Sequence, residues 1–289
     1  MKCKLCGSDS LEISNYYEFS LFMMARKLPY LIPSSIVNLF AKNLFAKKIL
    51  INKQYFSKNK VQCKNCDLGF VDPQFKSNEL SAYYQKQYWD HRDKFEGLHT
   101  VIFENGTHFN DEQLSIHRER INFIHSYIGD YDSVIDFGAG DCSASFMFKK
   151  DNKTVTAFDY SDKSKHVCKA IGVNFVSETN NLPKTDLIYA SHSLEHVEDI
   201  TSIFNTFLQH PVSAKYLFFE TPNIETSFIF KNLIHTPHTY MLNEKAFRQI
   251  AQKFNLKIIG LELSGSHWSY FKRSQKNCRP DIRVLFSKK

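Results

Sequence analysis

The sequence predicts an α/β fold, built on an open, doubly wound parallel sheet of seven strands. From about residue 131 onward, short runs rich in β-branched residues alternate with helical stretches, which is the rhythm of consecutive βαβ units. Gly138 and Gly140 directly follow the first of these runs, where a ligand-binding turn is expected. Two C-x-x-C motifs near the start of the chain predict an additional small metal-binding module.

Three regions of the chain differ in residue composition and pattern, and each is expected to form a separate unit. Residues 1–75 carry both cysteine pairs and a long insert between them, residues 76–125 read as helices rich in Tyr, His and charge, and residues 126–289 carry the alternating pattern. A chain of 289 residues can hold one full-sized domain and a smaller one. The start "MKCKLCGS" lacks the pattern of a signal peptide and no run of about 18 residues is apolar, so a cytoplasmic protein is expected.

The elements of the sheet can be placed in order along the chain. The expected strands are residues 133–136, 154–159, 173–176, 186–190, 215–220, 256–262 and 282–287. The expected helices are residues 142–150, 162–171, 199–209 and 243–254. The last helix has a clear start signal, because Asn243 can cap it and Glu244 lies in its first turn. In a sheet of this kind the ligand lies beyond the carboxyl ends of the strands.

The composition and net charge of the chain are compatible with several classes of binding partner and do not distinguish between them. Hydrophobic residues make up 43% of the chain and aromatic residues 15%, as in a folded globular protein. The formal net charge is +7, with much of the excess in residues 26–60 and in the C-terminal tail. Such an excess fits an anionic small substrate, a membrane surface or RNA.

The glycine turn indicates which small molecule it binds. Gly138 and Gly140 allow backbone N–H groups to approach a ligand closely, and Asp159, at the end of the next strand, can accept hydrogen bonds from both hydroxyls of a ribose. A pyrophosphate-binding turn needs a third glycine, whereas Asp141-Cys142-Ser143 follow here. Asp136, just before the turn, would repel a pyrophosphate and suits a cationic amino-acid ligand. The turn therefore favours S-adenosylmethionine over NAD.

The stretch Asp136-Phe137-Gly138-Ala139-Gly140, with Asp159 on the second strand, resembles the D-x-G-x-G motif of class I S-adenosylmethionine-dependent methyltransferases. The resemblance implies a Rossmann-like methyltransferase sheet with S-adenosylmethionine as the methyl donor. Cys142 stands where the family usually carries another glycine, a position that tolerates small residues. A plain βα turn of some other α/β enzyme is the alternative.

The segment His192-Ser193-Leu194-Glu195-His196 resembles the H-x-L-E-H segment of a methyltransferase subgroup that acts on quinones, sugars and other small metabolites. The resemblance implies that His192 and Glu195 close over the methyl donor, and that His196 borders the acceptor pocket as a candidate catalytic residue. In the alternative interpretation, Glu195 and His196 only hold the loop through hydrogen bonds.

The loop after the fifth strand carries the preferred general base. "FFETPN" also resembles the subgroup, and the N/D-P-P-Y/F/W box of enzymes that methylate base and glutamine nitrogens is absent. His238, in "HTPHTYMLNEKAF", is the preferred base because an imidazole titrates near neutrality and can take a proton from a hydroxyl or an activated carbon. His235 is the second candidate. Alternatively, His238 only caps helix 243–254.

The two cysteine pairs predict a structural zinc site. Cys3, Cys6, Cys63 and Cys66 supply four thiolates, which can bind zinc tetrahedrally and leave no coordination position open. Without an export signal, the spacing favours metal binding over disulfides. A redox role for the C-x-x-C motifs is the weaker alternative.

The chain resembles deoxysugar C-methyltransferases and related enzymes of surface-polysaccharide clusters in the order of its segments. These are the two C-x-x-C motifs, "GFVDP", "YYQKQYW" and then the methyltransferase sheet. The resemblance implies that the zinc module, the 83–109 segment and the 235–240 segment enclose a sugar or nucleotide-linked sugar. The family's Y-H-E-H segment is replaced by His235-Thr236-Pro237-His238, so C- and O-methylation both stay open. The residues expected to line the pocket are Tyr83, Tyr84, Tyr88 and His91.

The insert, residues 19–56, combines an apolar stripe at near-helical spacing with several lysines. Residues 35–50 could contact a membrane surface and hold the enzyme at the inner face of the membrane, although packing as a lid or dimer contact is favoured. An RNA methyltransferase is the alternative function, disfavoured by diffuse positive charge. A non-catalytic binding protein is disfavoured by the intact glycine turn and Asp159. We expect no nucleic-acid partner, and the sequence does not predict the oligomeric state.

Overall fold

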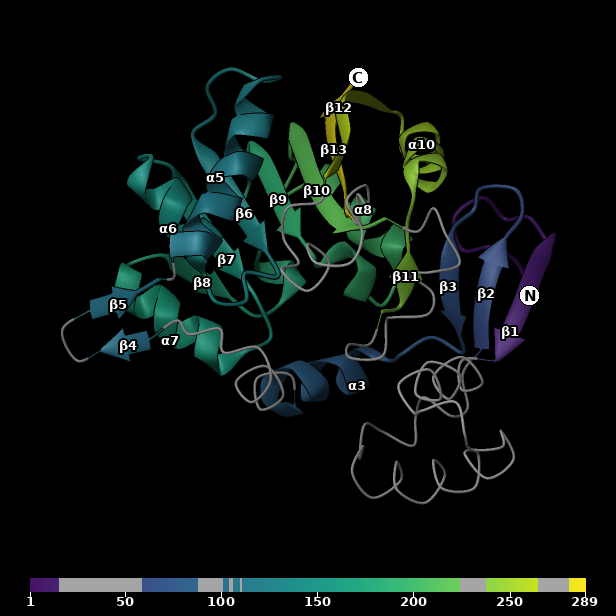
Figure 1. Cartoon of the computed structure of the whole chain (residues 1–289), viewed down its shortest axis with the longest axis horizontal. Helices are drawn as coiled ribbons and strands as arrows, with labels where there is room; N and C mark the ends of the chain where they lie inside the picture. Colours follow the sequence, from purple (N-terminus) through teal and green to yellow (C-terminus); the bar gives the residue numbers. More distant parts are fainter. Residues whose placement is uncertain (16–58, 88–100, 104–105, 110, 224–237, 265–280) are drawn as a thin grey trace, which may run out of the picture.

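The main body of the protein is a seven-stranded sheet, which Figure 1 shows in a computed structural model of the whole chain. The structure describes residues 1–15, 59–87, 101–103, 106–109, 111–223, 238–264 and 281–289. The strands of the sheet are β6 (Ser133–Phe137), β7 (Thr154–Phe158), β8 (Asn174–Val176), β9 (Leu187–Ser191), β10 (Tyr216–Pro222), β12 (Leu256–Ser264) and β13 (Asp281–Lys288).

The strand order is β12-β13-β10-β9-β6-β7-β8, so the chain reverses direction across the sheet at β6. Five neighbouring strands, β10 to β8, pair in parallel, whereas β13 runs antiparallel between β10 and β12. All seven expected strands are confirmed to within two residues at either end. The reversal places a topological switch point between β6 and β9, where a ligand is expected beyond the carboxyl ends of the strands.

Helices cover both faces of the sheet, because alternate strand residues point to opposite sides and both sets are apolar. Ile135 and Phe219 belong to the core under α8 (Ile200–Leu208) and α10 (Glu244–Lys253). Val134 and Phe218 belong to the other core, under α5 (Asp111–His125), α6 (Ser143–Lys150) and α7 (Asp162–Ile171). The four helices expected between the strands are therefore confirmed. α5 packs in the second core although it precedes the expected domain boundary at residue 126.

The cysteine-rich module is a small antiparallel sheet that the far end of the chain completes. Its strands are β1 (Leu11–Asn15), β2 (Asn59–Cys63) and β3 (Gly69–Asp72), and β11 (Tyr240–Met241) pairs with β3. Tyr240 lies opposite Phe70, and the Val71 N–H donates to the Thr239 carbonyl over 3.0 Å. The segment that carries His238 is thus held directly by the module.

The module also shares a hydrophobic core with the main sheet. Leu5 and Phe70 lie in the same buried cluster as the residues under α8 and α10. Lys253 of α10 donates to the Leu5 carbonyl over 3.1 Å, and Lys245 of α10 pairs with Asp67 at 3.2 Å. Figure 1 shows the module beside α10, with the N-terminus at its outer edge. Packing therefore fixes the position of the module relative to the carboxyl ends of the strands.

Along the chain, β3 is followed by α3 (Ser77–Ala82) and a π-helical turn at Tyr83–Gln87. The short antiparallel pair β4 (Val101–Phe103) and β5 (Gly106–His108) comes before α5. The whole insert, residues 19–56, lies outside the described residues, so its expected contact with a membrane, or as a lid or dimer contact, stays a prediction. Among the described ranges, no helix is long and apolar enough to cross a membrane.

Candidate functional site

The turn after β6 needs glycine at residue 138. Gly138 has φ +75°, and a Cβ built there would lie 2.2 Å from the Ser193 Oγ atom. Gly140 has φ +55°, with no atom nearer than 3.9 Å to its Cβ position. Cys142 also has a positive φ, of 62°. Three residues in the left-handed region make a tight turn, whose backbone lies against the segment after β9.

Asp159 lies beside this turn, and backbone amides hold its carboxylate in place. Its Oδ2 accepts a hydrogen bond from the Gly140 N–H over 2.8 Å, and its Oδ1 accepts one from the Ser161 N–H over 2.8 Å. A carboxylate has about four acceptor positions, so it can accept hydrogen bonds from several donors at once. The arrangement can therefore accept the hydroxyls of a ribose beside the turn.

Asp136 is more deeply buried than an acid that lines a ligand surface. It is 3% exposed, and its Oδ2 accepts a hydrogen bond from the Ser145 Oγ of α6 over 2.6 Å. Burial raises the pKa of Asp136 to about 7. The structure thus places Asp136 at the base of the turn, where it fixes the start of α6.

The segment after β9 folds into a short 3-10 turn over Leu194–His196. His192 lies 3.5 Å from the Glu195 carboxylate through Nδ1 and 3.4 Å from that of Glu220 through Nε2. Burial lowers the pKa of His192, but the Glu195 and Glu220 carboxylates outweigh it and raise the pKa to about 10. His192 is therefore a cation between two acids, and it ties this segment to β10.

Glu220, the second acid next to His192, belongs to a buried network of ion pairs with two arginines. Glu220 is fully buried, and both Arg120 and Arg283 donate to its carboxylate through their Nε atoms, at 2.7 Å for Arg120. Arg283 also donates to Glu262 over 2.9 Å. Arg120 and Arg283 were not predicted as site residues from the sequence. A Glu inside the apolar strand "YLFFETP" nevertheless indicates that a buried cationic partner exists.

The expected acceptor-side residues meet next to this network. The rings of His196 and His238 are 4.6 Å apart edge to face, and the Tyr84 ring lies 5.6 Å from that of His196. The Thr239 N–H donates to the Glu195 carbonyl over 2.8 Å, which joins the β9 segment to the segment before β11. Residues from three separate parts of the sequence thus form one cluster.

Burial, assisted by the charge of His196, lowers the pKa of His238 to about 3, so this imidazole is neutral. His238 does not cap α10: Asn243 does, accepting from the Ala246 N–H over 2.9 Å. The helix-cap alternative for His238 is therefore wrong. Tyr83 lies beside Tyr84, with ring centroids 5.1 Å apart. His235, Tyr88 and His91 lie outside the described residues.

Several buried polar atoms line the carboxyl edge of the sheet without a hydrogen-bond partner in the described part of the chain. Ser264, and Pro222 between Thr221 and Asn223, both lie opposite Asp281 in the sheet register, so the sheet residues of this group form a row across neighbouring strands. The atoms are both carboxylate oxygens of Glu195 and Asp281, the hydroxyls of Thr221, Thr239 and Ser264, and Oδ1 of Asn223. Buried polar atoms normally have partners, so the row is suited to a polar ligand.

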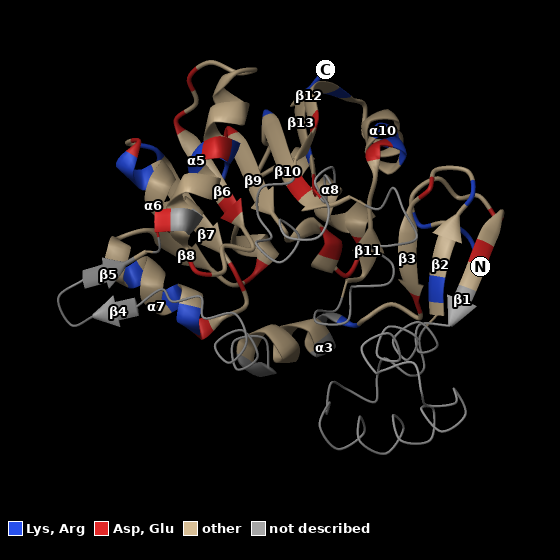
Figure 2. Cartoon of the chain, viewed as in Figure 1, with Lys and Arg blue, Asp and Glu red and all other residues tan. Residues whose placement is uncertain are grey.

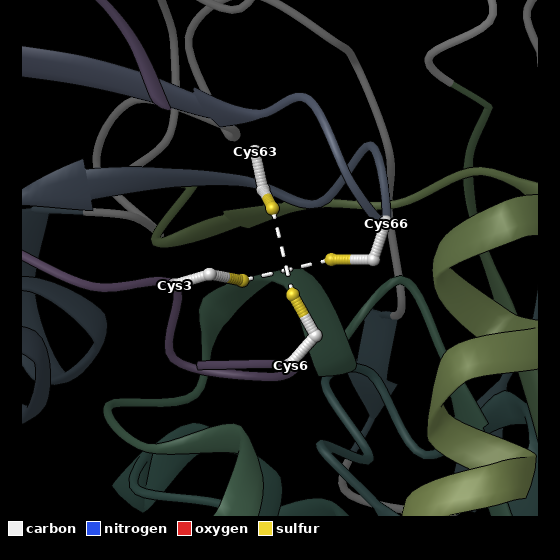
Figure 3. Close-up of side chains that lie close together, drawn as sticks. All are labelled: Cys3, Cys6, Cys63 and Cys66. Atoms are coloured by element: carbon white, nitrogen blue, oxygen red, sulfur yellow. Dashed lines mark hydrogen bonds between the residues drawn. The ribbon is translucent and has the colours of Figure 1, made fainter. Parts of the chain in front are cut away.

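The four predicted metal ligands converge in the module, as Figure 3 shows. The Sγ atoms of Cys3 and Cys66 are 3.6 Å apart, as are those of Cys6 and Cys63. Tetrahedral zinc with Zn–S bonds of about 2.3 Å places its sulfurs about 3.8 Å apart, whereas a disulfide needs about 2.05 Å. A hydrogen bond from Cys66 lowers the pKa of Cys3 to about 5. The residues fit a zinc ion with no open position.

Comparison with known proteins bears on the same region. The sequence matches the family described as "Methyltransferase domain" over residues 107–261, which is more than half of the chain. The match spans the glycine turn, Asp159, the segment after β9 and His238. No curated protein matches this chain significantly by sequence.

Solved structures of methyltransferases share the fold of this chain. Magnesium protoporphyrin IX methyltransferase from Synechocystis PCC 6803, with bound S-adenosylhomocysteine, has 13% identity and a TM-score of 0.51, covering 73% of this chain and 98% of that one. An S-adenosylmethionine-dependent methyltransferase from Archaeoglobus fulgidus has 15% identity and a TM-score of 0.52, covering 70% of this chain and 99% of that one. At these identities, the likeness shows the fold.

Proposed function

Because the chain belongs to the methyltransferase domain family and is an S-adenosylmethionine-dependent methyltransferase, we propose that it methylates a sugar or nucleotide-linked sugar of surface-polysaccharide biosynthesis. The acceptor lies at the carboxyl edge of β9 and β10, between the cysteine-rich module, Tyr84 and His238. The observation that carries the proposal is the row of buried oxygens at this edge that lack hydrogen-bond partners among the described residues.

The donor occupies the turn after β6 in this proposal. Asp159 accepts the ribose hydroxyls, and the backbone of Gly138 and Gly140 lies against the amino-acid part. Asp136 supports the turn from beneath, through Ser145. His192 and Glu195 close the site on the β9 side, where Ser193 lies against Gly138.

A sugar suits the acceptor side because it carries several hydroxyls on one small rigid ring. Each hydroxyl can donate one hydrogen bond and accept two, so a sugar can satisfy carboxylate oxygens such as those of Asp281 and hydroxyls such as that of Thr221 together. Leaving buried polar atoms unpaired costs about 1–3 kcal/mol each, which favours a ligand with matching groups. The Tyr84 ring offers an apolar face to the C–H side of the sugar.

Methyl transfer is an in-line displacement, in which the acceptor atom bonds to the methyl carbon as the bond from carbon to sulfur breaks. Holding both reactants in line supplies much of the rate. The acceptor also loses a proton, and in this proposal the neutral His238 imidazole, next to His196, takes it. A carbon or an oxygen of the acceptor can react in this way.

The cysteine-rich module is proposed to hold a structural zinc ion and to form one wall of the acceptor site. Its strand β3 binds Thr239 and Tyr240 directly, so the zinc ion stabilises the segment that carries His238. In Figure 2, the Lys and Arg residues of the described ranges are spread over the module and the helices of the main body, which supports a small acceptor over RNA.

The test is methyl transfer from labelled S-adenosylmethionine to a panel of nucleotide sugars, free sugars, quinols and structured RNA. We expect label in at least one nucleotide sugar, abolished in Asp159→Ala, and NMR of the product then locates the methyl group on carbon or oxygen. Label in RNA or a quinol, with none in any sugar, would overturn the proposed acceptor. Failure of the wild-type protein to bind S-adenosylhomocysteine would overturn the donor site.

A further inference from the structure

Glu195, His196 and His238 bring three potential metal ligands to one point on the acceptor side. One nitrogen or oxygen of each residue lies within 4.8 Å of the corresponding atoms of the other two. Glu195 and His196 are neighbours in the 3-10 turn after β9, and His238 comes from the segment before β11. The hydrogen bond from the Thr239 N–H to the Glu195 carbonyl fixes the two segments against each other at 2.8 Å.

The carboxylate of Glu195 lies beside the His192 cation, but it is buried and makes no hydrogen bond with the described residues. Glu195 is 2% exposed, and neither of its side-chain oxygens accepts a hydrogen bond from the described residues. Its nearest charged neighbours are His192 at 3.5 Å and His196 at 3.8 Å, both beyond good hydrogen-bond geometry. A buried carboxylate is normally paired, hydrogen-bonded or bound to a metal. A cation between Glu195 and the two imidazoles would satisfy it.

The ligand types indicate which cation. Two imidazoles and one carboxylate suit Zn²⁺, Mn²⁺, Fe²⁺, Co²⁺ or Ni²⁺, whereas Mg²⁺ and Ca²⁺ prefer oxygen-only sites. Tetrahedral ligands with bonds of about 2.0–2.1 Å lie about 3.4 Å apart. From a spacing of up to 4.8 Å, the side chains need to close by about 1.4 Å at most. Three protein ligands leave at least one position open, in contrast with the four-cysteine site.

The second metal-like group in the sheet is unsuitable, because its acid already has partners. His192, Glu220 and Asp281 also lie within reach of one another, but Glu220 accepts hydrogen bonds from Arg120 and Arg283. Two guanidinium groups next to an ion would repel it. No arginine among the described residues pairs with Glu195, and its cationic neighbour His192 also lies against Glu220.

We propose that Glu195, His196 and His238 bind one divalent transition-metal ion with an open coordination position that faces the methyl acceptor. Its binding does not depend on what is methylated, whereas its use in catalysis rests on the proposed function. With His238 bound to the ion, an acceptor hydroxyl in the open position would have a lowered pKa and would lose its proton to solvent, in place of the transfer to His238. The oxygen then bonds to the donor methyl while the bond from that carbon to sulfur breaks, and S-adenosylhomocysteine leaves.

The test is cobalt titration of the metal-stripped full chain, followed by absorption spectroscopy and elemental analysis. Cobalt bound by the four cysteines gives intense thiolate charge-transfer bands, whereas cobalt bound by two histidines and one carboxylate gives only weak ligand-field bands. We expect two equivalents in the wild-type protein, one of each kind. A single equivalent with thiolate bands alone would overturn the proposal.

Variants assign the second equivalent. Glu195→Gln and His238→Gln are each expected to weaken its binding at least 10–100-fold, the range seen even for residues outside the ligand shell, while the thiolate bands stay. His166→Gln, an exposed histidine on α7, is the matched control and should keep both equivalents. Circular dichroism and urea unfolding check the fold of each variant. Retention of the ligand-field bands by both folded variants would overturn the assignment.

The two proposals fail separately. Sugar methylation by a protein that binds only the thiolate-bound equivalent would overturn the second metal site and leave the sugar acceptor standing. Binding of both equivalents by a protein that methylates only RNA or a quinol would support the metal site and overturn the sugar.

Discussion

The carboxylate of Asp159 accepts a hydrogen bond from the backbone N–H of Gly140, with 2.8 Å between Oδ2 and N. This bond joins the end of β7 to the turn after β6, so the acid is already oriented before any donor binds. Its position beside the turn makes Asp159 the residue whose removal should most directly test the donor site.

Asp159→Ala is expected to weaken binding of S-adenosylhomocysteine about 10–100-fold, because hydrogen bonds to a charged group contribute about 1.5–3 kcal/mol. Isothermal titration calorimetry measures the change. Asp162→Ala removes an exposed acid three residues further along and should bind as the wild type does. Equal affinity of the two variants would show that Asp159 is not a ribose ligand.

The contact between Gly138 and Ser193 predicts a specific steric conflict. Gly138→Ala places a Cβ 2.2 Å from Oγ and 2.6 Å from Cβ of Ser193, at φ +75°, and should lower the free energy of unfolding by about 2–5 kcal/mol. Gly140→Ala meets only the strain of its positive φ and should cost about 1–2 kcal/mol. Urea unfolding measures both values.

Ser193→Gly removes both clashing atoms and should rescue part of the loss in Gly138→Ala. The rescue appears as a coupling energy in the double-mutant cycle. If the two substitutions were strictly additive, the close approach of the two segments would be wrong.

Burial of Asp136 predicts a pH-dependent gain in stability for Asp136→Asn. The folded-state pKa is about 7, above the ordinary value of 3.8, so the wild-type protein loses stability as pH rises between these values. The free energy of unfolding of Asp136→Asn, relative to wild type, should therefore grow from pH 4 to pH 7 and then level off. One pKa unit corresponds to about 1.4 kcal/mol, so we expect a gain of roughly 1–4 kcal/mol at pH 8.

Urea unfolding of both proteins at several pH values measures this difference. The Asn side chain keeps an acceptor for the Ser145 hydroxyl, so the local structure is retained. A difference in stability that does not change with pH would show that Asp136 ionises as freely as in the unfolded chain.

The sequence predicts the main sheet well because its elements are specified locally. Buried strands such as "LIYAS" contain continuous apolar runs. Asn243 caps α10, as its position before Glu244 indicates. β11 could not be predicted, because two residues, Tyr240 and Met241, form a strand only through pairing with β3, far away in the sequence. Local patterns carry no information on such a partner.

The candidate site shows the same division. The donor residues lie in contiguous motifs, so the glycine turn and Asp159 could be located from the sequence. The partners of Glu220 lie on α5 and β13, 100 and 63 residues away, and only the tertiary structure brings Arg120 and Arg283 to it. Charged pairs of this kind require both strand order and register to be known.

Removal of one zinc ligand should affect the acceptor more than the donor. Cys63→Ser removes one of four thiolates at the end of β2, which should release the metal and loosen the sheet that β3 forms with β11. We expect a higher KM for the acceptor and an affinity for S-adenosylhomocysteine within about twofold of wild type. Elemental analysis, calorimetry and steady-state kinetics measure the three effects.

Cys168→Ser is the control, because Cys168 is a buried thiol of α7 outside the four-cysteine cluster. It should keep the zinc ion and the acceptor KM of the wild-type protein. A full equivalent of zinc in folded Cys63→Ser would contradict the four-thiolate site.

Lys60, on β2 of the cysteine-rich module, is a buried lysine whose charge acts on His238 of the proposed acceptor site. It is 4% exposed on β2, opposite Val71, whose N–H binds the Thr239 carbonyl. Its charge contributes to the lowered pKa of His238, and burial lowers the pKa of Lys60 itself to about 8. If the acceptor is a nucleotide-linked sugar, its phosphate can pair with this ammonium group, and Lys60→Met should raise the acceptor KM about 10–100-fold.

The pH dependence of Lys60→Met separates this role from a structural one. In the wild-type protein, the acceptor KM should rise above pH 8 as Lys60 loses its proton, and this rise should be absent in the variant. Because the folded-state pKa lies below 10.5, Lys60 lowers the stability at pH 7, and the variant should be at least as stable as the wild type there. Lys64→Met, at an exposed lysine paired with Glu12, should change neither quantity. An unchanged acceptor KM in Lys60→Met would exclude Lys60 as a phosphate ligand.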